Sequence, residues 1–414
     1  MARIAPFLIA LSFLAFISLG LPDTVLGVAW PSLRDHFGLS QASLGLVPLF
    51  GVSGYFVSGL LAGGLVRRLG VGALLAASSG LVALGLVGYA AASRWAFFFP
   101  VAAVIGLGSG AIDAALNGYA ARHFPIRIMN WLHASWSVGA TAGPAIMTAV
   151  LTLGASYRLG YAILAAALGA MTLAFTVTRR SWDDPLPREP DGRPDAVQPE
   201  AAPAHASGGS VWTALRSGRV WLQIVIFFAY TGAEAGTGAW CFTVLREARG
   251  LSVEEAGVWT TVFWASLTAG RVWLGFVVDR VGPDRLLRAA TVAALAGAAG
   301  FAGLPGLPGR LGLALLGFSL APVFPTLMAR TPARLGDDIA HHAIGFQVSA
   351  ATLGTAVLPG GFGLLAARAG AGVVPLLLVL SMVVLLGLHE VLLRATRDAA
   401  HHDPARVGPR RPPA

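Results

Sequence analysis

The chain has 414 residues, of which 56% are hydrophobic and only 12% are charged, and its formal net charge is +9. A soluble globular domain carries roughly 25% charged residues, so this sequence has too few charges to cover a water-facing surface. The basic excess comes from 29 arginines without any lysine, which excludes the ATP-binding loop whose motif requires a lysine.

Apolar residues occur in twelve blocks, each long enough for a helix to cross a hydrocarbon core of about 30 Å. In chain order the blocks span residues 7–30, 43–66, 71–93, 97–121, 128–153, 157–178, 219–244, 256–278, 286–304, 311–329, 341–365 and 372–395. Glycines inside these blocks fit a membrane bundle, where small residues let helices approach closely. We therefore predict an all-α membrane protein with 12 transmembrane helices in two pseudo-symmetric six-helix bundles.

A polar segment rich in proline and glycine separates the sixth block from the seventh. It has too little apolar surface to order itself, so we predict a flexible linker there. The expected organisation is an N-terminal six-helix bundle at 1–178, a cytoplasmic linker at 179–218, a C-terminal six-helix bundle at 219–395 and a disordered cytoplasmic tail at 396–414.

The distribution of the arginines predicts the orientation of the chain. With a cytoplasmic N-terminus, 21 arginines fall in cytoplasmic segments, seven fall on the other side, and Arg271 lies within a helix. Because cytoplasmic loops carry an excess of basic residues, we expect a multi-pass protein of the inner (plasma) membrane with both termini in the cytoplasm. This topology accounts for most of the basic charge, so no nucleic-acid partner is expected.

The two halves of the sequence repeat each other at an offset of 212 residues, which places Gly63 to Gly70 on Gly275 to Gly282. The second copy reads G-x-x-x-D-R-x-G and resembles the signature loop of the major facilitator superfamily, although Arg67 occupies the acidic position in the first copy. The resemblance implies two halves that move around a site at their interface. It also implies conformational loops formed by Gly63, Arg68, Gly70, Gly275, Asp279, Arg280 and Gly282.

Three further stretches are similar to the fucose/glucose:proton symporter group of that superfamily. They are Gly20-Leu-Pro-Asp23, the run from Gly106 through Asp113 and Asn117 into Leu132-His133, and Tyr230-x-Gly-x-Glu234 through Trp240 to Gly270-Arg271. The resemblance implies that Asp23 and Asp113 match the pair of carboxylates implicated in proton coupling and sugar binding in that group.

Ionisable residues inside apolar spans also point to function, because a charge at a helix centre costs about 2.5 to 3.5 kcal/mol to insert. We expect Asp23 and Asp113 to couple protons. The alternatives are a helix-breaking Leu-Pro-Asp element at Asp23 and a structural pair between Asp113 and His133, while Arg271 is expected to anchor the inner end of its helix. The expected substrate-binding residues are Asn117, His133, Trp136, Glu234, Trp240, Trp264, Phe324 and Gln347.

These features predict a secondary active transporter and not an enzyme. We expect a monomer, surrounded by membrane lipids, that carries a small polar solute such as a monosaccharide together with protons by alternating access, without a cofactor or a metal. Gly139-x-x-x-Gly143-Pro144 partly matches the signature of drug antiporters, so a proton-driven exporter of drugs or metabolites is an alternative. A non-transporting membrane sensor is a third, but it would need no carboxylates within its spans.

Overall fold

A computed structural model describes residues 6–124, 126–182 and 211–401, and the helices of its first half coincide with the first six predicted spans. α1 and α2 together form the first span, and α3 to α7 form the next five. The bounds are Pro6–Asp23 (α1), Val25–Phe37 (α2), Leu46–Leu69 (α3), Val71–Ala91 (α4), Phe98–His123 (α5), Ile126–Thr152 (α6) and Tyr157–Thr178 (α7). Short helical turns flank them at Gln41–Gly45 (η1), Trp95–Phe97 (η2) and Arg179–Ser181 (η3).

The second half repeats this order. The bounds are Gly218–Thr243 (α9), Val253–Val281 (α10), Pro283–Gly303 (α11), Gly306–Leu320 (α12), Val323–Ala329 (α13), Asp337–Ala369 (α15) and Val374–His401 (α16). α12 and α13 together form the tenth span. The shorter helices are Val211–Arg216 (α8), Val244–Ala248 (η4), Thr331–Leu335 (α14) and Ala371–Val373 (η5).

The first and tenth spans are each broken next to a proline. α1 ends at Asp23, one residue after Pro22, and Thr24 separates it from α2. Pro322 precedes α13 in the same way. Proline has no amide proton for the helical ladder and disfavours a continuous helix. The first break leaves Asp23 at a helix end in the middle of a 31-residue span that runs from Phe7 to Phe37.

Nine helical segments within the described residues are long and apolar enough to cross a membrane by length and composition. The three long helices outside that set are α6, α9 and α10. They carry buried polar side chains such as Ser137, Gln223 and Thr260, and α6 packs on α10 while α9 packs on α2. Since these polar faces meet other helices instead of lipid, the three helices complete an architecture of twelve spanning helices in two six-helix bundles.

The backbone reproduces the sequence repeat at its turns. Gly38 and Gly250, which are 212 residues apart, have φ of +63° and +67°. Gly70 and Gly282, at the same offset, have φ of +81° and +83°. A residue with a Cβ adopts such positive φ values only with strain. The equivalent turns of the two bundles therefore need glycine for the same conformational reason.

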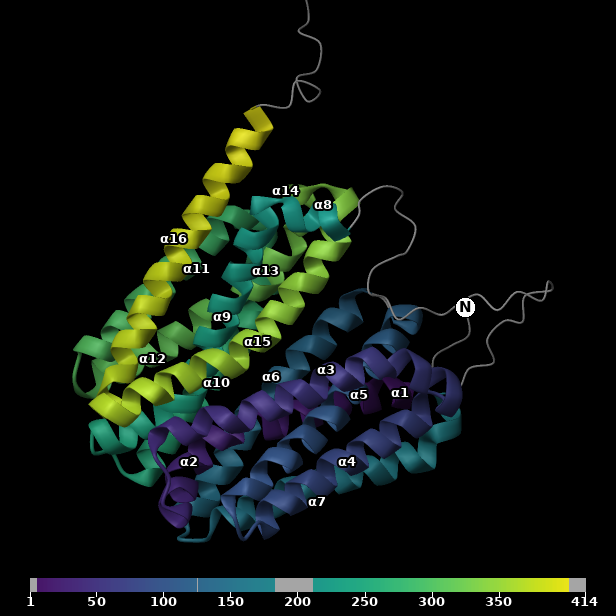
Figure 1. Cartoon of the computed structure of the whole chain (residues 1–414), viewed down its shortest axis with the longest axis vertical. Coiled ribbons are helices and arrows are strands. Elements are labelled where there is room, and N and C mark those ends of the chain that lie inside the picture. The colour runs from purple at the N-terminus through teal and green to yellow at the C-terminus, as the bar shows by residue number, and fades with distance from the viewer. Residues whose placement is uncertain (1–5, 125, 183–210, 402–414) are drawn as a thin grey trace, which may run out of the picture.

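The two bundles meet at the end of the molecule opposite the segment that joins them. We call the end where α7 stops and α9 begins the linker end. At the other end, Arg34 Nη1 of α2 pairs with Glu247 Oε1 of η4 at 2.7 Å, and Gln41 Nε2 donates to Glu247 Oε2 at 2.9 Å. Gly45 and Gly360 pack there so closely that a Cβ on Gly45 would lie 2.2 Å from the Gly360 Cα. Figure 1 shows the helices of the two bundles diverging toward the linker end.

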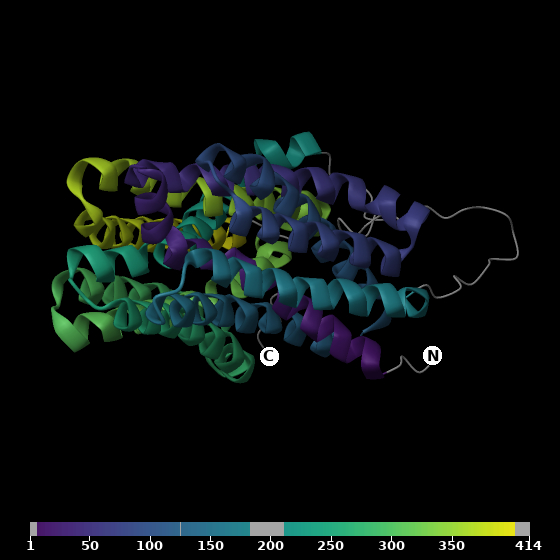
Figure 2. The same cartoon turned by 90° about the horizontal axis from the view of Figure 1, so that it is seen from below.

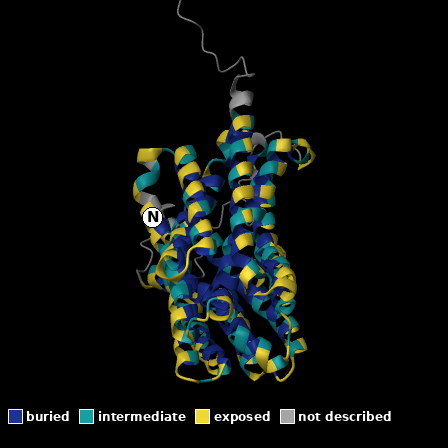
Figure 3. Ribbon diagram, turned by 90° about the vertical axis from the view of Figure 1, so that its left-hand side faces the viewer, coloured by how far each residue is buried: buried dark blue, intermediate teal, exposed yellow. Residues whose placement is uncertain are grey.

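The outer faces of the bundles are apolar and exposed. The helices run in a common direction along the molecule (Figure 2), with buried residues gathered where the bundles meet and exposed ones around the outside (Figure 3). Leu60 of α3 is 86% exposed and Leu84 of α4 is 68% exposed. Such a surface is stable against lipid and unstable against water, which agrees with a protein embedded in a membrane.

The predicted linker and tail fall partly outside the described residues, namely at 183–210 and 402–414. The described ends of the linker are helical, in η3 and α8. α16 continues to His401, six residues beyond the predicted end of the C-terminal bundle at 395. Thr396 Oγ1 donates to the Leu392 carbonyl within this extension at 2.7 Å, and alanine and arginine favour a helix there.

Candidate functional site

The carboxylate of Asp23 lies exposed at the interface between the bundles. The break after Pro22 ends α1 at this residue. Trp136 Nε1 of α6 donates to its Oδ2 at 3.0 Å. Thr24, the next residue, donates its hydroxyl to the Ala140 carbonyl at 2.8 Å, which attaches the break to α6. The other oxygen, Oδ1, has no protein donor within the described residues, so Asp23 can accept a proton or a solute hydroxyl there.

Asp113 lies on α5 in the same bundle and is half-buried. Tyr55 of α3 donates its hydroxyl to Oδ2 at 2.6 Å, and Asn117, one turn along α5, donates Nδ2 to Oδ1 at 2.9 Å. Both oxygens therefore have neutral donors. Asp113 and Asp23 belong to α5 and α1, which contact each other within the N-terminal bundle.

The C-terminal bundle contributes Glu234 of α9 and Arg271 of α10. Arg271 Nη2 lies 3.5 Å from Glu234 Oε1, and the side chains are 21% and 12% exposed. Tyr230 donates its hydroxyl to Glu234 Oε2 in a short hydrogen bond. Arg271 Nη1 also donates to Ser137 Oγ of α6 at 2.6 Å. Arg271 thus connects the two bundles, and it is more than the helix anchor that the sequence predicted.

Trp136 is the point where the two sets of side chains meet. Its indole nitrogen bonds Asp23 of its own bundle, and the Arg271 guanidinium of the other bundle lies 5.3 Å from its ring centroid. Trp264 of α10 approaches it edge-on, with the ring centroids 6.4 Å apart at 79°. Trp264 itself is 5% exposed, and its indole nitrogen has no partner within the described residues.

The structure does not bring all the predicted substrate-binding residues to this interface. Trp240 and Gln347 are completely buried. Trp240 Nε1 donates to the Pro359 carbonyl at 2.9 Å, and Gln347 bonds Gln223 and Thr331 inside the C-terminal bundle. Phe324 is half-buried and packs edge-on against Phe227 at 5.3 Å. In this structure Trp240 and Gln347 do not face the interface, because their polar atoms are paired within the C-terminal bundle.

The side chain of His133 lies outside the described residues, although α6 runs through that position. The surroundings of Gly275 and Asp279 in the second conformational loop lie outside them as well. Arg68 and Arg280 are exposed, and Gly63 is half-buried. The Gly70 amide donates to the Val66 carbonyl at 2.9 Å, and the Gly282 amide donates to the Val278 carbonyl at 3.0 Å. These bonds cap the C-terminal ends of α3 and α10.

Tyr55 and Arg271 belong to the site but were not among its predicted members. The signal for Arg271 was present, because the cost of a charge inside a span applies to arginine as it does to Asp23. Tyr55 offered no such signal, since an isolated tyrosine in a glycine-rich helix is typical of packing. Within the described residues no group of three or more His, Cys, Asp or Glu side chains could hold a metal ion.

Two repeated six-helix bundles with ionisable side chains at their interface define the class of secondary membrane transporters. The family model of the Major Facilitator Superfamily matches residues 11–359. The chain belongs to this superfamily and is therefore a transporter and not an enzyme.

The relatives in sequence are distant. "Bypass of stop codon protein 6" of Saccharomyces cerevisiae is 26% identical over 64% of this chain, but the match covers only 56% of the yeast protein. "Uncharacterized transporter y4wD" of Sinorhizobium fredii is 26% identical over 82% of this chain and 86% of that protein.

Solved structures share the fold at low identity. A bacterial homologue of the human lysosomal transporter Spinster, in an inward-facing and unoccupied conformation, has a TM-score of 0.76 at 14% identity and covers 96% of this chain and 98% of its own. The nucleoside transporter NupG has a TM-score of 0.69 at 18% identity, and the match covers 95% of this chain and 99% of NupG. A variant of the E. coli fucose:proton symporter FucP has a TM-score of 0.60 at 18% identity, and the match covers 94% of this chain and 99% of FucP.

Proposed function

We propose that this chain is a proton-coupled symporter of a small polar solute. The observation that carries the proposal is the exposed carboxylate of Asp23 in the middle of a spanning segment, with one indole donor on one of its oxygens. A carboxylate that moves between water and a shielded environment can take up and release a proton near neutral pH. Asp23 then couples protons, and Asp113 of the same bundle adjusts the local charge.

The balance of charge favours a neutral or cationic solute. Asp23, Asp113 and Glu234 place three carboxyl groups at the interface, against the single guanidinium of Arg271. An anionic solute would meet repulsion from the N-terminal carboxylates. A hydroxyl-rich solute could instead donate to Asp23 and Glu234 and accept from the Trp264 indole, which has no other partner in the described part of the chain.

The aromatic side chains suit a solute with a sugar ring. Trp136 and Trp264 stand edge to face beside Asp23, and an aromatic face packs well on the apolar face of a ring. Two of the structurally similar proteins are named for solutes that contain such a ring, fucose and nucleosides. Asn117 and Glu234 would supply polar contacts to its hydroxyls.

In the proposed orientation the protein spans the inner membrane, and its linker end faces the cytoplasm. The exposed Arg67, Arg68 and Arg280 lie at that end, as the bias of basic residues toward the cytoplasm predicts. Because the bundles make contact at the opposite end, the conformation described here would be the inward-facing one. Alternating access would then require the contacts between Arg34, Gln41 and Glu247 to open.

The motif that suggested a drug exporter has a packing explanation. A Cβ on Gly139 would lie 1.9 Å from the Ile17 carbonyl oxygen, and one on Gly143 would lie 2.2 Å from that of Leu21. These glycines let α6 approach α1 and hold Trp136 beside Asp23. The spacing of these glycines therefore does not favour export over uptake. We retain symport as the proposed use of the carboxylates at the interface.

Proton flux in proteoliposomes tests the proposal. Solutes that raise the unfolding temperature of the purified protein, drawn from sugars, nucleosides, amino acids and drugs, would be added outside, and external pH would be recorded. We expect alkalinisation with wild type and none with Asp23→Asn, while Glu254→Gln, an exposed change in the first turn of α10, behaves as wild type. Solute uptake without proton movement, or equal flux with Asp23→Asn, would refute it, and acidification would indicate an exporter.

A further inference from the structure

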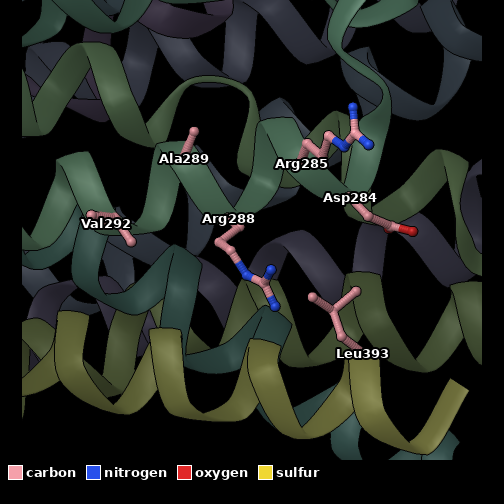
Figure 4. A pocket seen from close by; sticks show the side chains of 6 residues that line it. All are labelled: Asp284, Arg285, Arg288, Ala289, Val292 and Leu393. Atoms are coloured by element: carbon pink, nitrogen blue, oxygen red, sulfur yellow. The ribbon is translucent and has the colours of Figure 1, made fainter. Parts of the chain in front are cut away.

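A crevice at the linker end of the C-terminal bundle lies apart from the interfacial site. It has a volume of about 310 Å³ and is lined by Asp284, Arg285, Arg288, Ala289, Val292 and Leu393. Figure 4 shows Arg288 extending from α11 toward α16, from which Leu393 faces it. None of these residues takes part in the proposed transport reaction.

The charges around the crevice do not balance. Asp284 accepts from Arg330 Nη2 at 3.0 Å and from Arg334 Nη2 at 2.8 Å. Arg288 pairs with Glu390 of α16 at 2.5 Å. Arg285 is exposed and forms no ion pair within the described residues. Four arginines thus face two carboxylates, and this cluster has an excess of two positive charges.

The buried members of the cluster also have polar atoms without a partner in the described structure. The Arg334 side chain is 1% exposed, and its Nε and Nη1 have no partner in the part of the chain that the structure describes. His389 of α16 is 1% exposed, and its Nε2 is likewise unpartnered there. Positive charge that is only partly compensated attracts anions, and Asp284, the partner of Arg334, lines the crevice.

The side chains change from charged to apolar with depth. Arg285, Arg288, Ala289 and Val292 are spaced three and four residues apart on one face of α11, so they form a stripe along the helix. At 1.5 Å per residue, the stripe extends about 10 Å from the helix start toward the middle of the span. Val292 is 49% exposed, so the deep end of the crevice opens to lipid chains.

We propose that this crevice binds an anionic phospholipid. Arg285 and Arg288 contact its phosphate at the headgroup level, and Ala289, Val292 and Leu393 contact its upper acyl chain. Basic pockets between membrane helices on the cytoplasmic side recognise such headgroups. A free phosphate would match the charges but would leave the apolar half of the crevice unused, which is why the geometry favours a lipid.

Native mass spectrometry of the delipidated full-length protein, titrated with phosphatidylglycerol or phosphatidylcholine, tests this site. We expect wild type to retain phosphatidylglycerol preferentially and Arg285→Gln to bind it about fivefold more weakly, as the loss of one basic contact near the headgroups predicts. Arg285 has no folding partner to lose in the described structure. Arg368→Gln, an exposed arginine at the opposite end, serves as the matched control and should bind as wild type does.

Glu390→Gln provides a second, opposite test. It frees Arg288 from its carboxylate partner, so phosphatidylglycerol should bind more tightly, whereas a purely structural ion pair predicts no gain. Equal retention of the two lipids, wild-type binding by Arg285→Gln, or weaker binding by Glu390→Gln would each overturn the proposal. Displacement of the lipid by inorganic phosphate alone would overturn it as well, and would assign the crevice to a free anion.

Discussion

The carboxylates at the interface differ in how their oxygens are used. Both oxygens of Asp113 accept from neutral donors, Tyr55 and Asn117, and Glu234 is held by Tyr230 and Arg271. Asp23 is the exposed member and has a single donor, Trp136. Access to water therefore distinguishes Asp23 from the other two carboxylates, and it is the reason for our proposal that Asp23 exchanges protons.

Gln347 illustrates a polar residue whose role is structural. It is completely buried; it accepts from Thr331 Oγ1 at 3.1 Å and donates Nε2 to Gln223 Oε1 at 3.0 Å. Gln347→Leu removes both of these bonds, at about 0.5 to 1.5 kcal/mol for each, while Thr331 and Gln223 still bond each other. We expect a lower unfolding temperature for the purified protein with an unchanged apparent affinity for its solute.

Thr352→Val, at a half-buried position one turn and a residue further along α15, is the matched control for Gln347→Leu, since the Thr352 hydroxyl bonds only the Val348 carbonyl in the described structure. It should unfold at nearly the wild-type temperature. If Gln347→Leu instead weakened solute binding at unchanged stability, the assignment of Gln347 to the bundle core would be wrong.

At the scale of helices, glycines decide which surfaces can touch. α6 lies against α1 through Gly139, where a Cβ would meet the Ile17 carbonyl oxygen at 1.9 Å. We expect Gly139→Ala to separate the helices, to lower the unfolding temperature and to reduce transport, because Trp136 one turn away would lose its position beside Asp23. The measurement is thermal unfolding together with proton flux.

Gly169→Ala in α7 is the control for this change, because a Cβ there has nothing within 4 Å. Alanine is favoured over glycine in a helix by about 1 kcal/mol, so Gly169→Ala should be neutral or stabilising. Were Gly139→Ala equally harmless, the close contact between α6 and α1 would not be what positions the site.

The helices themselves could be predicted from the sequence because length and apolar composition act locally. All twelve predicted spans correspond to helices, including the broken ones at Pro22 and Pro322. α6, α9 and α10 were found although their polar side chains lower their hydropathy, since each still has the length of a span. The contacts between them could not be predicted, because Arg271 with Ser137 and Tyr55 with Asp113 join residues far apart in the chain.

Aromatic and amide residues were the least predictable members of the site. Trp240 lies on α9 and Gln347 lies on α15. The rotation of each helix about its own axis decides which of its residues face the interface. Trp136 faces the interface and Trp240 faces α15. Neither residue type nor spacing distinguishes the two tryptophans. Only the structure does, because it shows which acceptor each indole nitrogen bonds.

At the scale of the whole molecule, the two bundles are held together at one end and diverge at the other. Arg34, Gln41 and Glu247 bridge the bundles at the closed end. Between that end and Asp23, the small residues Gly27 and Gly238 bring α2 and α9 together, with a Cβ on Gly27 2.6 Å from the Gly238 carbonyl oxygen. The interfacial side chains lie where the contact ends, so motion of the bundles would change which end gives access to them.

The distance between the bundles at the linker end is the measurement that tests this account most directly. Spin labels at Ala121→Cys of α5 and Ala333→Cys of α14 are on exposed residues of different bundles, and Cys241, the only native cysteine, is buried. Double electron–electron resonance in lipid nanodiscs should yield a long distance and a shorter one, with populations that shift between acidic and alkaline buffer in wild type and stay constant in Asp23→Asn. A single distance that ignores pH and solute would contradict alternating access coupled to protons through Asp23.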